Sequence, residues 1–183
     1  MSQLFMRRPN LEDLPEIRLP PGYEIRTYRP GDEAAWSHIM SKTIGGSSDP
    51  DRCRREIIEK PQFSPDRLFL LTWRGEPVGS ACAWQQLPEE REAGYVHMVG
   101  VLEEHRGKGL GYMLVLKTLY WFKEHGFKCA TLHTDDFRIP AIKTYLKLGF
   151  LPVFTDETHP ARWRAIEEKL GIQIPKGGEI RES

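Results

Sequence analysis

The most regular apolar pattern in the chain lies within residues 109–125. Apolar side chains recur there three and four positions apart, which is the spacing of one face of a helix. These positions are Tyr112, Val115, Leu116, Leu119 and Phe122. Further apolar residues occupy the positions between them, so we expect a long helix that is buried over most of its surface.

A second helix is predicted over residues 139–148, with Pro140 in its first turn and Gly149 at its C-terminal end. Proline suits the first turn of a helix, and glycine suits the residue that follows the last turn. Asp32 is a candidate cap for another, shorter helix. The shorter helices are predicted over residues 33–40, 51–60 and 162–170.

Short runs of apolar or alternating residues, bounded by glycines and charges, predict strands. They cover residues 23–29, 67–73, 77–86, 92–102, 128–134 and 150–154. Residues 1–22 contain four prolines and predict an extended lead-in, and residues 172–183 predict a flexible tail. Two helices follow the first strand, three strands follow these helices, and single helices and strands then take turns, which predicts a mixed α/β fold in one domain spanning residues 1–183.

The composition is typical of a folded domain. Hydrophobic residues make up 39% and charged residues 28% of the 183 residues, a mixture that excludes disordered and collagen-like chains. The 26 Lys and Arg residues balance the 26 Asp and Glu residues. We therefore expect no nucleic-acid partner, because such a partner normally requires a basic excess.

The cysteines and the apolar runs indicate the compartment. Cys53, Cys82 and Cys129 lie far apart and form no CxxC pair, which argues against a disulfide framework or a zinc site and suits a reducing environment. No apolar run is long enough for a membrane span or a secretory signal. We expect a cytoplasmic protein with no membrane partner.

The strongest chemical signal is a glycine-rich turn between a predicted strand and the long helix. The segment from Val99 to Gly111 reads VGVLEEHRGKGLG. Glycines let a ligand approach the main chain, and the first N–H groups of a helix point at such a ligand. Arg106 and Lys108 add positive charge at the positive end of the helix dipole. We therefore expect an anion here, and a phosphate fits best.

Two common phosphate-binding patterns do not fit this turn. The pattern G-x-G-x-x-G requires glycine where the chain has Tyr112, and the P-loop requires glycine at Leu102 and Ser or Thr at Gly109. The spacing Arg106-x-x-Gly109-x-Gly111 instead resembles the pyrophosphate-binding motif of the GNAT N-acetyltransferase superfamily.

This resemblance implies that main-chain amides of the turn hold the pyrophosphate of acetyl-CoA, which serves as co-substrate. It also implies a mixed, mostly antiparallel sheet of six to seven strands, flanked by helices and splayed at its middle strands. The main chain of residues 98–101 would then be free to pair with the pantetheine arm.

The segment from Ala141 to Phe150, AIKTYLKLGF, resembles the helix and strand A-x-x-x-Y-x-x-x-G-F of the same family. The resemblance implies that the Tyr145 hydroxyl protonates the departing CoA thiolate. A core aromatic is the alternative, because Tyr145 lies on the apolar face of its helix. The family commonly has asparagine where this chain has Arg138, so one cofactor contact is lost or replaced.

Taken together, the two motifs and the neighbouring strand end assign a set of cofactor contacts. They are Met98, Val99, Gly100, Val101, Arg106, Gly107, Lys108, Gly109, Leu110, Gly111, Tyr112, Thr134, Arg138 and Tyr145.

Transfer to an amine also requires a proton acceptor, because amines are mostly protonated at neutral pH. His97 lies four residues before Val101, and strand alternation would place Tyr95, His97, Val99 and Val101 on one face. An ordinary histidine pKa of about 6.5 suits this role, and a buried core histidine is the alternative. Glu92, at the start of the same strand, is the rival candidate.

Three further sets of residues bear on metal binding and on the acceptor side. His133 and Asp135 end one strand but have no third ligand at a suitable spacing, so we expect no metal. The loop of residues 45–50 lies in the region that shapes the acceptor site in the family. A set of aromatic residues either lines an acceptor pocket or belongs to the core. These are Trp36, Phe63, Trp84 and Tyr95.

The sequence therefore predicts an enzyme that moves an acetyl group from acetyl-CoA to a primary amine by direct attack in a ternary complex. The amine would belong to a small molecule or a peptide, and the protein would be a monomer or a homodimer. The alternative is a non-catalytic acyl-CoA-binding regulatory module. Such a module would keep the turn of residues 106–111 and dispense with Tyr145 and a base, so the presence of Tyr145 favours the enzyme.

Overall fold

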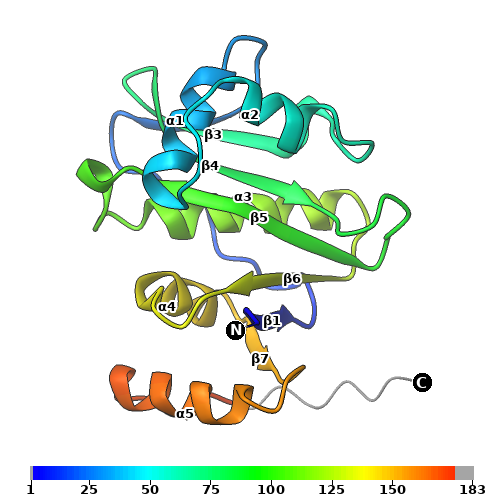
Figure 1. Ribbon diagram of the computed structural model, residues 1–183, viewed down its shortest axis with the longest axis vertical. Coiled ribbons are helices and arrows are strands. Elements are labelled where there is room, and N and C mark those ends of the chain that lie inside the picture. The colour runs from blue at the N-terminus through cyan, green and yellow to red at the C-terminus, as the bar shows by residue number, and fades with distance from the viewer. Residues whose placement is uncertain (1, 176–183) are drawn as a thin grey trace.

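Seven strands form one sheet in the computed structural model, which describes residues 2–175 (Figure 1). The strand order is β2-β3-β4-β5-β6-β1-β7, and only the pair β5–β6 is parallel. The mostly antiparallel sheet confirms the predicted fold class. The strands are β1 (Leu4–Arg8), β2 (Tyr23–Thr27), β3 (Leu68–Trp73), β4 (Glu76–Trp84), β5 (Ala93–Val101), β6 (Cys129–Thr134) and β7 (Leu151–Val153).

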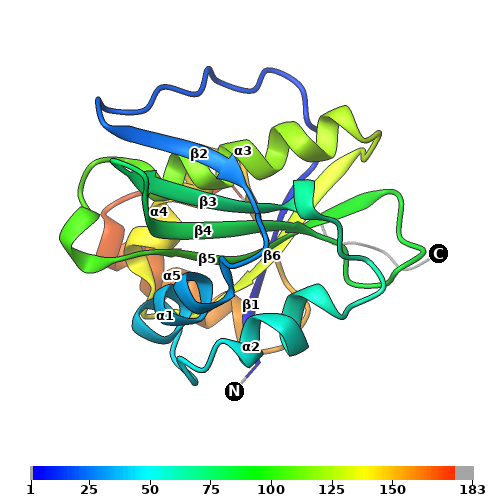
Figure 2. The same ribbon diagram turned by 90° about the horizontal axis from the view of Figure 1, so that it is seen from above.

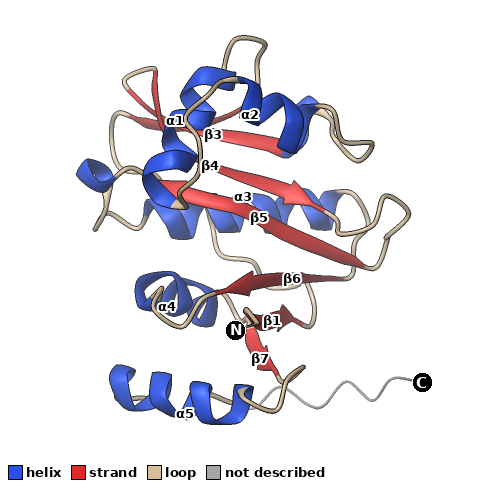
Figure 3. Cartoon of the chain, in the orientation of Figure 1, coloured by secondary structure: helices blue, strands red, loops and turns tan. Residues whose placement is uncertain are grey.

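Helices cover both faces of the sheet (Figure 2), and Figure 3 separates them from the strands by colour. The short α2 continues as one π-helical turn over Arg54–Ile58. With α1 it covers one face, whereas α3 covers the other. The helices are α1 (Glu33–Thr43), α2 (Asp51–Cys53), α3 (Leu110–Glu124), α4 (Ile139–Lys147) and α5 (His159–Leu170).

Two apolar cores lie on the two faces of the sheet, and the alternation of β3 shows how one strand serves both. Leu68 and Leu70 pack with α1, whereas Phe69 and Leu71 pack with α3. Side chains point alternately to opposite faces of a strand, so a strand covered on both faces is apolar along its whole length. This explains the unbroken apolar run in β3.

Two details of the predicted helix starts differ: the capping bond of α1, which begins at Glu33 as predicted, and the first residue of α5. Asp32 precedes α1, but its carboxylate makes no cap bond to that helix. It instead accepts two hydrogen bonds of 2.8 Å from Arg26 and one of 2.7 Å from the Arg29 amide. Helix α5 begins at His159 rather than at residue 162, with Pro160 in its first turn, a position that proline favours.

The predicted lead-in contains an internal strand. Residues 4–8 form β1, which pairs with β6 on one side and β7 on the other. Leu4 and Met6 are fully buried in the core beneath α3. The extended chain that follows crosses α3, where the Tyr120 hydroxyl donates to the Pro15 carbonyl at 2.7 Å. Residues 4–8 are extended, as predicted, but they form an internal strand whose partners lie more than a hundred residues away.

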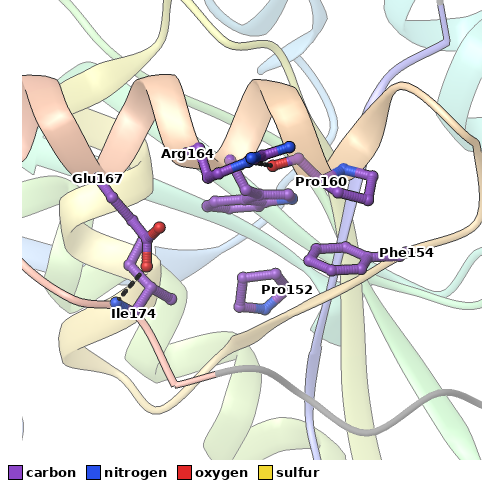
Figure 4. Close-up of a pocket in the computed structure, with 7 residues that line it drawn as sticks. Pro152, Phe154, Pro160, Arg164, Glu167 and Ile174 are labelled. Carbon is purple, nitrogen blue, oxygen red and sulfur yellow. Dashed lines mark hydrogen bonds between the residues drawn. The ribbon is translucent and has the colours of Figure 1, made fainter.

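The start of the predicted tail packs against the domain, and residues 176–183 lie outside the described residues. The Ile174 amide donates to a Glu167 carboxylate oxygen at 2.8 Å. Ile174 closes an apolar pocket of about 220 Å³ that Pro152, Phe154 and Trp163 line from β7 and α5 (Figure 4). The tail prediction is therefore wrong for this residue.

An extra residue in β5 shifts its register against β4. Gly79 pairs with Val101, but Cys82 pairs with His97, so Met98 and Val99 together stand opposite one residue of β4. Met98 adopts φ +53°, a left-handed conformation that is unusual outside glycine. Such a β-bulge bends its strand.

The bulge also changes which face the side chains occupy. Tyr95 and Met98 pack on the α1 face, whereas Val99 and Val101 pack on the α3 face. The expectation that Tyr95, His97, Val99 and Val101 share one face is therefore wrong, because a register shift of one residue reverses the alternation.

Strands β5 and β6 diverge toward their C-terminal ends (Figure 1). They pair only from Ala93 and Cys129 to Tyr95 and Thr131. Beyond this point, the end of β5 pairs with β4 on one side only. The sheet is thus splayed at its middle strands, as predicted, and we call this divergence the fork.

The internal position of β1 predicts a large loss of stability on truncating Leu4. Leu4→Ala should lower the free energy of unfolding by about 2–5 kcal/mol, because it leaves a cavity in a packed core. Chemical denaturation would measure this loss. Gln3→Ala, at an exposed neighbouring position, should change stability by less than about 0.5 kcal/mol. Equal effects of the two substitutions would contradict an internal β1.

Candidate active site

A cleft of about 470 Å³ opens at the fork. It lies between the end of β5, the turn before α3, the start of α4 and the end of α1. The lining residues are Thr43, Val99, Gly100, Val101, Arg106, Gly107, Gly109, Leu110, Gly111, Tyr112, Val115, Arg138, Pro140, Ala141, Thr144 and Tyr145. The cleft brings together all predicted cofactor contacts except Met98, Lys108 and Thr134.

These three residues lie elsewhere for separate reasons. The bulge turns Met98 into the core beneath α1. Lys108 is exposed and does not line the cleft. Thr134 is buried, and its hydroxyl has no hydrogen-bond partner among residues 2–175.

The turn before α3 presents unpaired main-chain donors. The first bond of the helix runs from the Met113 amide to the Gly109 carbonyl, so the amides of residues 110–112 have no acceptor within the helix. Gly107 and Gly109 have φ values of +78° and +72°, which glycine tolerates and other residues resist. A Cβ at Gly109 or Gly111 would meet nothing within 4 Å. The turn is therefore open to a ligand.

Arg106 is fixed beside these donors. Its Nε donates to the Val101 carbonyl at 3.1 Å, and its side chain lines the cleft. The guanidinium and the positive end of the α3 dipole act in the same place, which favours an anion there.

The opposite wall contains residues that the sequence analysis missed. A Cβ on Gly100 would lie 2.2 Å from Thr43 Oγ1, so the missing side chain lets the end of α1 approach β5. Thr43 could not be found from sequence, because only packing brings α1 to the cleft. Ala141 and Thr144 could have been found, since they lie four residues and one residue before Tyr145 on the exposed edge of α4.

Tyr145 lines the inner part of the cleft and is 8% exposed. Its ring contacts Phe150 edge to face, with centroids 6.0 Å apart. Burial raises the pKa of Tyr145 to about 12, an effect that the nearby Arg138 guanidinium partly opposes. The phenol therefore keeps its proton at neutral pH and can donate it.

Arg138 connects α4 to α1 across the cleft. Its Nε donates to Asp135 Oδ2 at 3.0 Å, and an Nη atom lies 3.5 Å from the Thr43 carbonyl oxygen. A neutral asparagine at this position would contribute no charge. Arg138 places a cation near the Tyr145 phenol.

His97 lies outside the cleft lining on the α1 face of the sheet. Its ring stacks on Trp84, with centroids 5.7 Å apart, and burial lowers its pKa to about 4. His97 is therefore neutral at neutral pH. The expectation of an ordinary histidine pKa at this position was wrong, because the side chain is desolvated.

Glu92 and two of the predicted pocket aromatics are remote from the cleft. Glu92 is exposed at the opposite end of β5, roughly 25 Å along the strand from Gly100. Trp36 is fully buried, and Phe63 packs on Tyr28 in the same core. Tyr95 and Trp84 remain beside His97.

Within residues 2–175, no three His, Cys, Asp or Glu side chains are grouped to hold a metal ion. No helix in the same range has the length and apolar character needed to cross a membrane.

Residues 33–150 match the acetyltransferase (GNAT) family. This stretch is well over half of the chain and contains both motifs and the fork. The chain therefore belongs to the acetyltransferase (GNAT) family, which confirms the family predicted from sequence.

Its relatives include enzymes named mycothiol acetyltransferase. That of Thermomonospora curvata is 34% identical over 154 residues, covering 80% of this chain and 50% of the relative. That of Streptomyces bingchenggensis is 34% identical over 162 residues, covering 82% and 51%. The chain thus spans about half the length of the curated relatives it matches.

Solved structures show the same fold. A GCN5-related N-acetyltransferase from Sphaerobacter thermophilus has a TM-score of 0.67 at 22% identity, covering 81% of this chain and 47% of that one. The ribosomal-protein-S18-alanine N-acetyltransferase of Escherichia coli has a TM-score of 0.57 at 18% identity, covering 69% and 76%.

The partial burial of His97, whose ring stacks on Trp84, predicts a specific pH dependence of stability. The unfolded chain binds a proton at this residue below about pH 6.5, whereas the folded chain binds it only near pH 4, to which burial lowers the His97 pKa. The free energy of unfolding should therefore decrease as the pH is lowered from about 6.5 to about 4, by up to about 1.4 kcal/mol per pH unit. His97→Phe should not show this part of the loss of stability. Chemical denaturation measured at several pH values between about 4 and 6.5 would test this.

His38→Phe serves as the control, because His38 is exposed. It should leave the pH dependence of the wild-type protein unchanged. If His97→Phe and the wild-type protein lose stability in parallel, His97 is not buried as described.

Proposed function

We propose that this protein transfers an acetyl group from acetyl-CoA to a primary amine by direct attack in a ternary complex. One observation supports this most strongly: a single cleft joins the open donors of the α3 turn to the Tyr145 phenol. One end of the cleft suits an anion, and the other holds a proton donor.

The cofactor would follow the length of the cleft. Its pyrophosphate would accept hydrogen bonds from the free amides at the start of α3 and from Arg106. The pantetheine arm would pair with the edge of β5 at residues 99–101, which β6 leaves open at the fork. The thioester would then lie near Tyr145.

Direct attack is favoured because the cysteines are poor nucleophiles. Cys53, Cys82 and Cys129 are buried, and none of them lines the cleft. Burial raises the pKa of Cys53 to about 12 and also raises that of Cys82, so both are protonated at neutral pH and unreactive. An acyl-enzyme intermediate therefore has no support.

The acceptor would be a small molecule with a primary amine. The relatives named mycothiol acetyltransferase make amines related to mycothiol the first candidates for a substrate panel. A non-catalytic acyl-CoA-binding module would not require the Tyr145 phenol in the cleft.

The cofactor geometry predicts that the phosphates contribute to affinity. Acetyl-CoA should bind more tightly than acetyl-pantetheine by several kcal/mol in calorimetry. Arg106→Ala should weaken acetyl-CoA binding by about 1.5–3 kcal/mol, the contribution of a charged hydrogen bond. Lys108→Ala is the matched control and should have a smaller effect, because Lys108 lies outside the cleft lining. Equal affinities for the two thioesters would exclude the phosphate site.

The proton donor is tested by removing one oxygen atom. Tyr145→Phe should lower kcat by about 10²-fold, the lower end of general-acid contributions, because a thiolate is a tolerable leaving group. Stability and acetyl-CoA affinity should barely change. Thiol release would be measured where chemistry is rate-limiting. An unchanged kcat there would make Tyr145 a core aromatic and favour the binding module.

A further inference from the structure

Two histidines flank the fork on the face of the sheet that carries α1. The last paired residues of β5 and β6 are Tyr95 and Thr131. His97 and His133 each lie two residues farther along their strands. Alternation therefore places both rings on the face to which Tyr95 points. This face is opposite the one covered by α3.

The His133 ring is held from two sides. Its Nδ1 lies 3.1 Å from the Tyr95 hydroxyl oxygen, and its ring packs on Phe5 of β1 with centroids 4.9 Å apart. Within residues 2–175, Nε2 makes no hydrogen bond and is not among the buried unpaired atoms. Nε2 is therefore the ring nitrogen that remains accessible.

His97 lacks the hydrogen bond that orients the ring of His133. It forms no hydrogen bond within the described residues; its ring stacks on Trp84 and is tilted against that of Tyr95. A base that acts at neutral pH works best when its pKa lies near that pH, and burial takes His97 well below it. Both histidines are half-buried, but only the His133 ring has a hydrogen bond that fixes its orientation.

We propose that His133, oriented by Tyr95, accepts the proton of the attacking amine. This role rests on the acetyl transfer proposed above. The neutral ring would carry its proton on Nδ1, and this N–H would donate a hydrogen bond to the Tyr95 oxygen. The lone pair of Nε2 would then face the amine. The hydrogen bond at one ring nitrogen sets the protonation of the other. Tyr95 is then a positioning residue.

The transfer balances with these groups. The nitrogen of the neutral amine bonds to the thioester carbonyl carbon, and the C–S bond breaks with its electron pair on sulfur. The nitrogen gives one proton to Nε2 of His133, and sulfur takes one from the Tyr145 phenol. Solvent then takes the proton from His133 and returns one to Tyr145. The products are the amide and the free thiol.

The surroundings of His133 set the pH at which it is active. Burial, and then the neighbouring His159, lower its pKa below the usual value. The rise of kcat/KM with pH should therefore occur below about pH 6.5. The titratable or charged groups on the elements around His133 are Tyr95 and His97 of β5, Arg7 of β1, His159 of α5 and Asp135 after β6.

The experiment compares kcat/KM for thiol release across pH in three variants, with acceptor amines of different pKa to separate their own titration. His133→Gln should lower kcat/KM by about 10²–10⁴-fold and abolish the low-pH rise. His97→Gln should retain that rise. Tyr95→Phe should shift the rise and cost less activity. Acetyl-CoA affinity, measured by calorimetry, should be unchanged in all three.

The assignment is overturned if the low-pH rise survives in His133→Gln or disappears in His97→Gln. Nitrogen NMR of the wild-type ring gives a readout that does not depend on the folding of any variant. A neutral His133 ring that carries its proton on Nδ1 supports the assignment of His133 as the base oriented by Tyr95. A proton on Nε2 overturns that assignment. If the wild-type protein releases no thiol with any amine, the proposed function fails as well. If the wild-type protein transfers the acetyl group and His133→Gln is fully active, only the roles of His133 and Tyr95 are excluded.

Discussion

The β-bulge at Met98 is the constraint on which the functional half of this molecule depends. A non-glycine residue at φ +53° costs about 1–2 kcal/mol, so its surroundings must hold it there. In return the bulge bends β5 away from β6 and reverses the direction of its last side chains. The main chain of residues 99–101 is left unpaired on the β6 side. A regular β5 would continue along β6, and the sheet would have no cleft at its centre.

The strand β1 completes the half of the sheet beyond the fork. Without it, β6 would expose its backbone at an unpaired edge, and β7 would have no neighbour. Alternation along β1 divides its contributions: Leu4 and Met6 fill the core beneath α3, while Phe5 packs on His133. The same five residues therefore support the fold and pack against the His133 ring.

Charge is divided between the two faces of the sheet. On the α3 face, Arg106, Arg138 and the helix dipole provide a positive cleft in which the Tyr145 phenol stays protonated. On the α1 face, burial keeps His97 and His133 toward their neutral forms. Burial thus keeps the Tyr145 phenol and the two histidine rings toward their uncharged forms, because it disfavours the charged form of each group.

The sequence by itself determined the features that neighbours along the chain control. The apolar period of α3, the glycine turn and the Tyr145–Phe150 segment depend on local backbone conformation and helical spacing, and all of them were predicted. The place of β1, the approach of Thr43 to Gly100 and the face of His97 were decided only by the tertiary structure. Each depends on partners far away in the chain or on the left-handed backbone conformation of Met98, which is not a glycine and so gives no signal in the sequence. Desolvation lowers the pKa of His97. It depends on all the groups that pack around the ring, and a local sequence pattern does not specify them.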